Sequence, residues 1–356
     1  MPYTPILFAR RRRRKKVGGW VPKSNNPSPA HVRRYVPPRP PSPFTVRDAP
    51  ASHQVFRTPE LLENILIRAD WQSVMSISRS SFYGRTVAQL AVCCRILEVI
   101  LPFVGNKMEK AKKFLDMMDR VGAGIIGSVA RRLLAINSAW MDEAISAGIT
   151  RFVSCRDLNL VVPPGRLELA VGWLGSLGYN TVRISPPSLP YSDSVTQIAR
   201  MGRKIGGILL FATISEARNG IAHVVASSLI TTQANIITSS RVYSFYPNSI
   251  ATQLALRTEF PHLKAIRKLC SPYVLTYNNE HWKRCGNLCP VAQRNTVGDK
   301  GIASFVFDSS RVVPVTRFEG TDYLLAEHVI LWRFSLKCRN RACENYDPGI
   351  ERVLLI

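Results

Sequence analysis

The chain has 356 residues and a formal net charge of +24, and 46% of its residues are hydrophobic. A chain of this length and apolar content can bury a large core, which excludes a wholly disordered protein. No stretch of about 18 apolar residues occurs, so we expect no transmembrane helix and no membrane partner. The only apolar triplet near the N-terminus precedes the basic run, the reverse of a signal peptide. We therefore expect an intracellular protein, in the nucleus or the cytoplasm, with its eight cysteines reduced.

Positive charge is concentrated near the N-terminus. Residues 1–50 hold 12 of the 48 lysines and arginines but only one of the 24 acidic residues. Seven cations are consecutive: Arg10, Arg11, Arg12, Arg13, Arg14, Lys15 and Lys16. Because like charges repel and prolines are frequent between Val21 and Pro50, residues 1–56 are expected to be a disordered tail. The run is typical of nuclear-import signals and of arms that bind the phosphates of nucleic acid, and a solubilising tail without a partner is the alternative.

A helical segment is expected over residues 57–121. Its first helix has Thr58 as the N-cap, Pro59 in the first turn and an early acid, Glu60, which the helix dipole favours. Apolar residues then recur at helical spacing: Leu61, Leu62, Ile65 and Leu66. Three further helices are predicted to begin at Asp70, Phe82 and Lys107.

A glycine turn between a strand and a helix begins the α/β part of the chain. Residues 123–126 are apolar and predict a short strand that ends at Gly127 and Ser128. A helix with an apolar stripe follows. Such a turn lets backbone N–H groups approach a phosphate at the start of a helix.

A second predicted strand, residues 157–162, carries two polar residues near its start. Side chains in a strand alternate between faces, so Asp157 and Asn159 lie on the same face. A helix from Leu167 follows, and Gly178 is suited to the left-handed conformation that ends many helices.

This order of strand, Gly-Ser turn, helix and polar strand resembles the nucleotidyltransferase fold. In that fold the turn binds a triphosphate, and two carboxylates on the strand, with a third on a neighbouring strand, hold Mg²⁺. The resemblance implies that the motif consists of Gly127, Ser128, Asp157 and Asn159. The neighbouring strand, predicted over residues 205–213, has no carboxylate, and Glu216 lies beyond it. Because Asn replaces an anionic ligand of a hard cation, the resemblance implies a degenerate fold without catalysis. Mg²⁺ and nucleotide would be cofactors only of the alternative, an active nucleotidyltransferase.

The first helix resembles the opening of an F-box, a short helical module that docks on the adaptor subunit of a cullin-type ubiquitin ligase. The resemblance implies a docking face made of Pro59, Leu61, Leu62, Ile65 and Leu66. Thr58 stands where that family has Leu, and no repeats follow as a substrate receptor. The alternative is that the apolar faces of these helices pack against the α/β part of the same chain. The combined pattern, from Thr58 to Ser309, resembles a large group of proteins from mushroom-forming fungi with no established activity.

The middle of the chain is expected to complete the same sheet and its covering helices. We predict a strand over residues 181–184, a hairpin with its turn at residues 201–204, a helix over 222–229, strands over 235–238 and 241–245, and a helix over 248–256.

Two close pairs of cysteines occur late in the chain: Cys285 with Cys289, and Cys338 with Cys343. Two such pairs form a tetrahedral thiolate site if they converge, and structural zinc is the natural occupant. Free cysteines on loops are the alternative. The remaining cysteines lie in apolar surroundings and are predicted to be in the core: Cys93, Cys94, Cys155 and Cys270.

The sequence thus predicts an α+β protein in four parts. These are a disordered basic tail (1–56), an F-box-like helical segment (57–121), a mixed-sheet nucleotidyltransferase-like α/β domain with cover helices (122–270) and a C-terminal extension with paired cysteines (271–356). We expect a noncatalytic intracellular binding protein, with the role of a ubiquitin-ligase substrate adaptor. The alternatives are an active Mg²⁺-dependent nucleotidyltransferase and a nuclear protein that binds nucleic acid through its basic tail.

Overall fold

The computed structural model describes residues 51–146, 155–187, 191–251, 253–256, 274–276, 285–286, 289, 291–294, 302–308, 325, 338 and 340–346. The chain divides after Ala49 into two units, and every described residue belongs to the second, Pro50–Ile356. The predicted basic run, Arg10–Lys16, and Cys270 lie outside the described residues.

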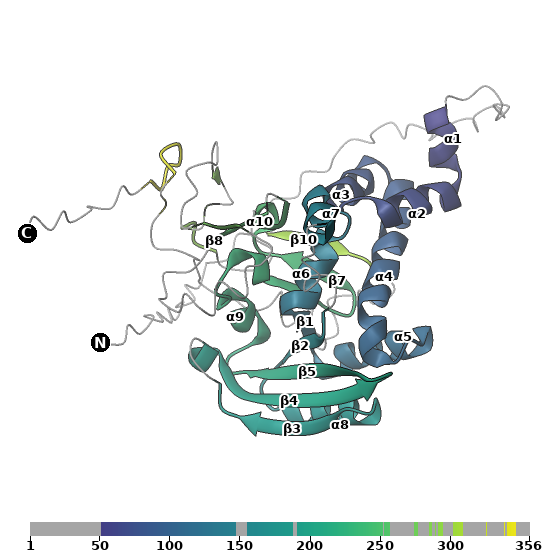
Figure 1. Ribbon diagram of the computed structural model, residues 1–356. Helices are drawn as coiled ribbons and strands as arrows, with labels where there is room; N and C mark the ends of the chain where they lie inside the picture. Colours follow the sequence, from purple (N-terminus) through teal and green to yellow (C-terminus); the bar gives the residue numbers. More distant parts are fainter. Residues whose placement is uncertain are drawn as a thin grey trace, which may run out of the picture. The chain divides into compact units, whose positions relative to one another are not determined.

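Five helices precede the first strand in the described chain (Figure 1): α1 (Ala51–Arg57), α2 (Pro59–Arg68), α3 (Trp71–Ser80), α4 (Phe82–Val104) and α5 (Met108–Val121). Regular structure begins six residues earlier than expected, because α1 occupies residues assigned to the tail. Thr58 takes the N-cap position of α2, but its hydroxyl donates to the Gln54 carbonyl at 2.9 Å instead of capping. Asp70 does cap α3, since its carboxylate accepts from the Ser73 N–H at 2.7 Å.

A buried arginine fixes the end of α2 against α4. Arg95 is 1% exposed, and its guanidinium donates to the carbonyls of Leu66, Ile67 and Ala69. These carbonyls belong to the last turn of α2 and its cap, where few backbone N–H partners remain, although Leu66 also accepts from the Ala69 N–H. Burial lowers the pKa of Arg95 to about 10, so the group stays charged at neutral pH.

Helix α4 is long and apolar enough to cross a membrane by length and composition, and it is the one such helix in the described part of the chain. Core helices of globular proteins pass the same test. Most of its apolar window is buried here, and α4 packs against α2, α3, α5 and α6 (Gly127–Ala135). The length of α4 therefore carries no evidence for a membrane protein.

The α/β part is built on a mixed sheet with the strand order β10-β7-β6-β1-β2-β5-β4-β3. The strands are β1 (Gly124–Ile126), β2 (Asp157–Val162), β3 (Asn180–Ser185), β4 (Val195–Ile205), β5 (Ile208–Ala217), β6 (Asn235–Ile237), β7 (Arg241–Ser244) and β10 (Ala303–Val306). β2 and β5 pair in parallel, and the other neighbours are antiparallel. A separate parallel pair is formed by β8 (Leu254–Leu256) and β9 (Val274–Thr276). The fold is α+β with a mixed sheet, as predicted.

The remaining helices connect and cover these strands: α7 (Ala139–Ser146), α8 (Leu167–Ser176), α9 (Ile221–Ala226), α10 (Pro247–Ala251) and the short 3-10 helices η3 (Tyr191–Asp193) and η4 (Thr231–Gln233). The strand predicted over residues 157–162 has these bounds in the structure. Gly178 follows α8 with a φ of 89°, the left-handed conformation expected of it.

Two predictions in the middle of the chain were wrong. The turn between β4 and β5 is Gly206-Gly207, not residues 201–204, and β4 runs unbroken to Ile205. Both glycines have positive φ angles, 54° and 82°, as a two-residue hairpin turn of the favoured twist requires. Residues 248–256 do not form one helix. α10 ends at Ala251, and Gln253, with a φ of 58°, precedes the strand β8.

One continuous core joins the four helices α2 to α5 to the sheet. Buried residues from Leu62 of α2 to Phe307 belong to the same apolar cluster. The Tyr179 hydroxyl donates to the Phe103 carbonyl at 3.0 Å, and burial raises the pKa of Tyr179 to about 12, so it remains a neutral donor. The predicted boundary at residues 121 and 122 therefore crosses a shared core and not a linker.

Candidate functional site

The strand register brings the predicted glycine turn against the polar strand. Ile126 of β1 lies opposite Asn159 of β2, so Gly127 follows directly beside Asn159. A Cβ on Gly127, whose φ is 72°, would lie 3.2 Å from the Asn159 Nδ2 atom. The Ser128 hydroxyl donates to the Asp157 carbonyl at 3.4 Å. The four residues of the sequence motif therefore lie together at the start of α6.

Asp157 is surrounded by neutral hydrogen-bond donors. The Thr213 hydroxyl donates to Asp157 Oδ1 at 3.1 Å. Burial raises the pKa of the Asp157 carboxyl, while hydrogen bonds from Thr213 and Asn159 and the charge of Arg200 act in the opposite direction. The carboxylate is thus satisfied within the protein, and no second carboxylate stands beside it among the described residues of this face.

The position expected for a third acid is occupied by a threonine. β2 and β5 are parallel and place Asn159 opposite Thr213, so both side chains lie on the Asp157 face. Glu216 lies within β5, not beyond the strand as expected, and pairs with Val162. Since Val162 is three residues from Asn159, Glu216 points to the opposite face of the sheet.

Glu216 has a structural role on that opposite face. Its Oε1 accepts from the N–H of Gly165 at 2.7 Å and from the N–H of Leu167 at 3.4 Å, at the start of α8. Its Oε2 accepts from the Thr196 hydroxyl at 2.9 Å. A carboxylate at a helix N-terminus is favourable because it satisfies N–H groups that lack intrahelical partners. Glu216 therefore caps α8 and does not converge with Asp157.

The predicted docking face on α2 is divided between core and surface. Leu62 and Leu66 are 2% and 1% exposed, while Leu61 and Ile65 are 49% and 50% exposed. The exposed pair is spaced by four residues and so lies on one face of the helix. Of the apolar residues predicted to bind an adaptor, Pro59, Leu61 and Ile65 are exposed, and Leu62 and Leu66 are buried.

The two cysteine pairs converge. The sulfur atoms of Cys285, Cys289, Cys338 and Cys343 all lie within 4.8 Å of one another, and all four side chains are buried. The Sγ–Sγ distance is 3.7 Å from Cys285 to Cys338 and 3.6 Å from Cys289 to Cys343. These are not disulfide distances, which are about 2.05 Å. Four sulfurs at about 2.3 Å from a central zinc ion would lie about 3.8 Å apart, so the donor set fits a tetrahedral metal site.

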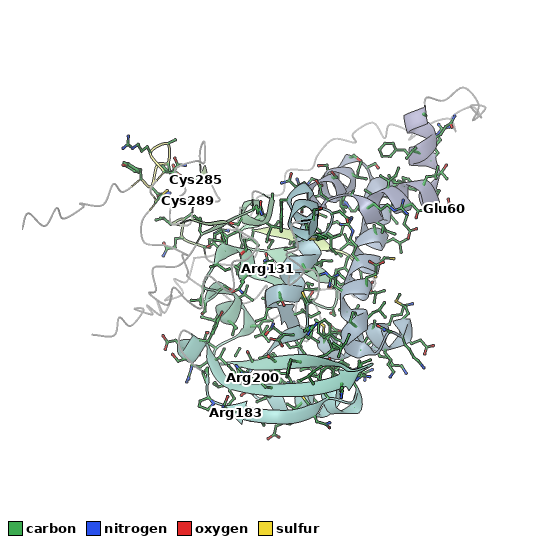
Figure 2. All side chains as sticks on the ribbon, viewed as in Figure 1. Glu60, Arg131, Arg183, Arg200, Cys285 and Cys289 are labelled. Carbon is green, nitrogen blue, oxygen red and sulfur yellow. The ribbon has the colours of Figure 1, made fainter. Side chains whose placement is uncertain are left out.

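Two asparagines direct polar hydrogens at the cysteine cluster. Asn340 Nδ2 donates to Cys285 Sγ at 3.2 Å, and the backbone N–H of Asn345 donates to Cys343 Sγ at 3.4 Å. Burial raises the pKa of Cys289 to about 12 and raises that of Cys285 further. Burial also opposes ionisation of the Cys343 thiol. Hydrogen bonds, first of all from the Asn345 N–H, outweigh burial and lower the pKa of Cys343. Figure 2 shows Cys285 and Cys289 close together.

Sequence reasoning missed the residues that set the hydrogen bonding and charge around Asp157 and around the four cysteines. Thr213 and Arg200 become neighbours of Asp157 only through the pairing of β2, β5 and β4, which no local spacing indicates. Asn340 and Asn345 could have been found, because each lies within three residues of Cys343 in a turn-rich segment.

Comparison of the chain with protein-family models gave no match, and comparison with curated proteins gave no significant match either.

Proposed function

We propose that this chain is a noncatalytic intracellular binding protein whose α/β part is a nucleotidyltransferase-like scaffold without metal-ion chemistry. The observation that carries the proposal is the composition of the Asp157 face. It offers one carboxylate, the amide of Asn159 and the hydroxyl of Thr213. Mg²⁺ gives up water reluctantly and is bound through anionic oxygens, so one carboxylate bonded to a threonine is a poor site. The Gly127 turn remains, which supports descent from a phosphate-binding arrangement.

A turnover assay tests this proposal. The full chain is incubated with each nucleoside triphosphate, Mg²⁺ or Mn²⁺, and protein or oligonucleotide acceptors. We expect no more transfer or pyrophosphate release than from an Asp157→Ala variant. Turnover that is present in the native chain and lost in Asp157→Ala would establish the alternative, an active nucleotidyltransferase.

We also propose that the four cysteines hold a structural Zn²⁺. The near-tetrahedral spacing of their sulfurs, the burial of all four side chains and the N–H donors from Asn340 and Asn345 support this assignment. A site closed by four protein ligands leaves no open position for substrate, so the role is structural and not catalytic.

The F-box resemblance supports an adaptor of the cullin-type ubiquitin ligases as a partner of α2. Pro59, Leu61 and Ile65 are available for it, because Leu62 and Leu66 are buried in the protein's own core. In a binding assay with the purified adaptor, Leu61→Asp with Ile65→Asp should abolish the interaction. Leu169→Asp is the matched control, since Leu169 of α8 is 51% exposed. Equal binding by the double variant and the control would rule out this docking face.

A further inference from the structure

One face of the strands β3, β4 and β5 is accessible in the described part of the chain. Helix α8 packs on the other face, where Ala199, Met201, Ala212 and Ile214 are buried. Figure 1 shows α8 behind these three strands. Among the described helices, α9 packs near the Ala217 end of the accessible face, and Arg183, Arg200, Lys204 and Phe211 on the rest of that face are exposed.

The accessible face is positively charged. Arg183 lies opposite Arg200 in the register of β3 and β4, and both are exposed. Figure 2 labels both arginines on these strands. Lys204 is also exposed and pairs with Leu209, so it lies on the same face. By contrast, Arg203 lies on the α8 face, where it donates to the Phe103 carbonyl at 3.4 Å.

Acidic residues are scarce on this face. β3 and β4 contain no carboxylate, and the one acid of β5, Glu216, caps α8 on the other side. Among the described strands, the one acidic residue on this face is Asp157, the first residue of β2. The positive charge of Arg200 offsets the negative charge of Asp157. The face therefore favours an anionic partner.

An exposed aromatic ring lies among these cations. Phe211 is 42% exposed and stands two residues before Thr213, which lies opposite Arg200. The residue opposite Phe211 is Gly202, which has no side chain to pack against the ring. Residues two apart on a strand are separated by about 7 Å, and neighbouring strands by about 5 Å. The ring and the arginines are therefore spaced on the scale of a single nucleotide.

We propose that this face binds single-stranded nucleic acid, with Phe211 stacking on a base and Arg183, Arg200 and Lys204 contacting phosphates. Single strands are held by cations that follow the backbone and by aromatic side chains that stack on unpaired bases. An acidic protein would use the cations but not the ring, and a duplex has no free base face to offer. The inference goes beyond the proposed function, because it needs neither nucleotide turnover nor an adaptor bound to α2.

The test measures the binding of fluorescent oligo(dT) and oligo(U) of about 16 nucleotides to the full chain by anisotropy. Phe211→Ala should raise the Kd between about fivefold and a hundredfold, the range for loss of one stacked base. Ile184→Ala is the matched control, because Ile184 is a 53% exposed apolar residue of β3 that pairs with Ala199 of the opposite face. The basic run Arg10–Lys16 is expected to add nonspecific phosphate contacts, so every variant is also compared in a background where these seven residues are Gln.

The salt dependence of oligonucleotide binding provides a second test, because it measures the number of phosphate contacts. Arg183→Gln with Arg200→Gln should flatten the slope of log Kd against log salt by about 1.4, because each lost phosphate contact contributes about 0.7 for a single strand. Lys112→Gln with Lys113→Gln removes the same charge from exposed positions of α5 and should leave the slope unchanged. The inference is overturned if the oligonucleotides do not bind, if duplex binds as tightly as single strand, or if the face variants behave like their controls. Comparison of the two oligonucleotides shows whether RNA or DNA is preferred.

Discussion

The Asp157 face and the cysteine cluster are both places where predicted site residues converge, but their donor atoms have different surroundings. At the Asp157 face the single carboxylate already accepts from Thr213, and its neighbours are an amide and a hydroxyl. At the cysteine cluster four cysteine sulfurs face one another. The Sγ–Sγ distance is 3.6 Å from Cys289 to Cys343 and 3.7 Å from Cys285 to Cys338. The comparison teaches that convergence alone does not make a metal site: one carboxylate among neutral oxygens is a poor donor set for a hard cation, whereas four thiols that ionise on metal binding suit zinc.

Loss of a cysteine should have the largest effect. Purified protein should contain about one zinc ion per chain, and Cys289→Ser should reduce this to background, since a four-ligand site tolerates few losses. Binding of Zn²⁺ to small zinc-finger peptides contributes about 10–16 kcal/mol, so the segment around the cluster should lose its protection from proteolysis. Metal content is measured by mass spectrometry after dialysis.

The control for that experiment is Cys155→Ser, which removes a thiol outside the cluster. Zinc content equal in the native chain, Cys155→Ser and Cys289→Ser would show that the four cysteines do not hold the metal.

Loss of the Glu216 cap should lower the stability by an intermediate amount. Glu216→Ala should lower the free energy of unfolding by about 1–3 kcal/mol, because two N–H groups at the start of α8 and the Thr196 hydroxyl lose their acceptor. Urea denaturation measures the change. Glu168→Ala, at an exposed acid in the first turn of the same helix, should cost less than about 1 kcal/mol. If the two variants are equally stable, Glu216 does not stabilise the start of α8.

Replacing Asp157 by a neutral residue should change the stability least, and it should raise the stability where the two other changes lower it. Burial raises the folded-state pKa of Asp157 above its unfolded value, so the stability from the neutral carboxyl is present below the unfolded pKa and is lost as pH rises through the folded pKa. At pH 7 the ionised group opposes folding, and Asp157→Asn should raise the Tm by roughly 1–3 °C. The difference should disappear in acid below about pH 4.

Asp116→Asn, at an exposed position of α5, is the control for this measurement. A lower Tm for Asp157→Asn at pH 7 would mean that the ionised carboxylate has a favourable partner in the folded protein, which would contradict the destabilising effect of its burial.

Local pattern predicted many of the elements and which residues to consider at both places, but not their surroundings. The bounds of β2 and the start of α6 at Gly127 agree with expectation, because alternation and turn chemistry are local signals. The paired spacing singled out the four cysteines but left open whether they converge, as the structure shows that they do. The face on which Glu216 lies depends on the parallel pairing of β2 with β5, which is a long-range choice. The burial of Leu62 beside the exposed Leu61 likewise depends on where α4 packs.

The central claim is that the glycine turn and Asp157 no longer form a nucleotide site. A thermal-shift titration of the full chain with each nucleoside triphosphate, with and without Mg²⁺, tests it most directly. Ligand at a hundredfold above Kd would stabilise a binding protein by about 2.7 kcal/mol, a shift that is easily measured. We predict no Mg²⁺-dependent shift at millimolar nucleotide. A Mg²⁺-dependent shift that disappears in Asp157→Ala would contradict the claim and identify the Asp157 face as a working nucleotide site.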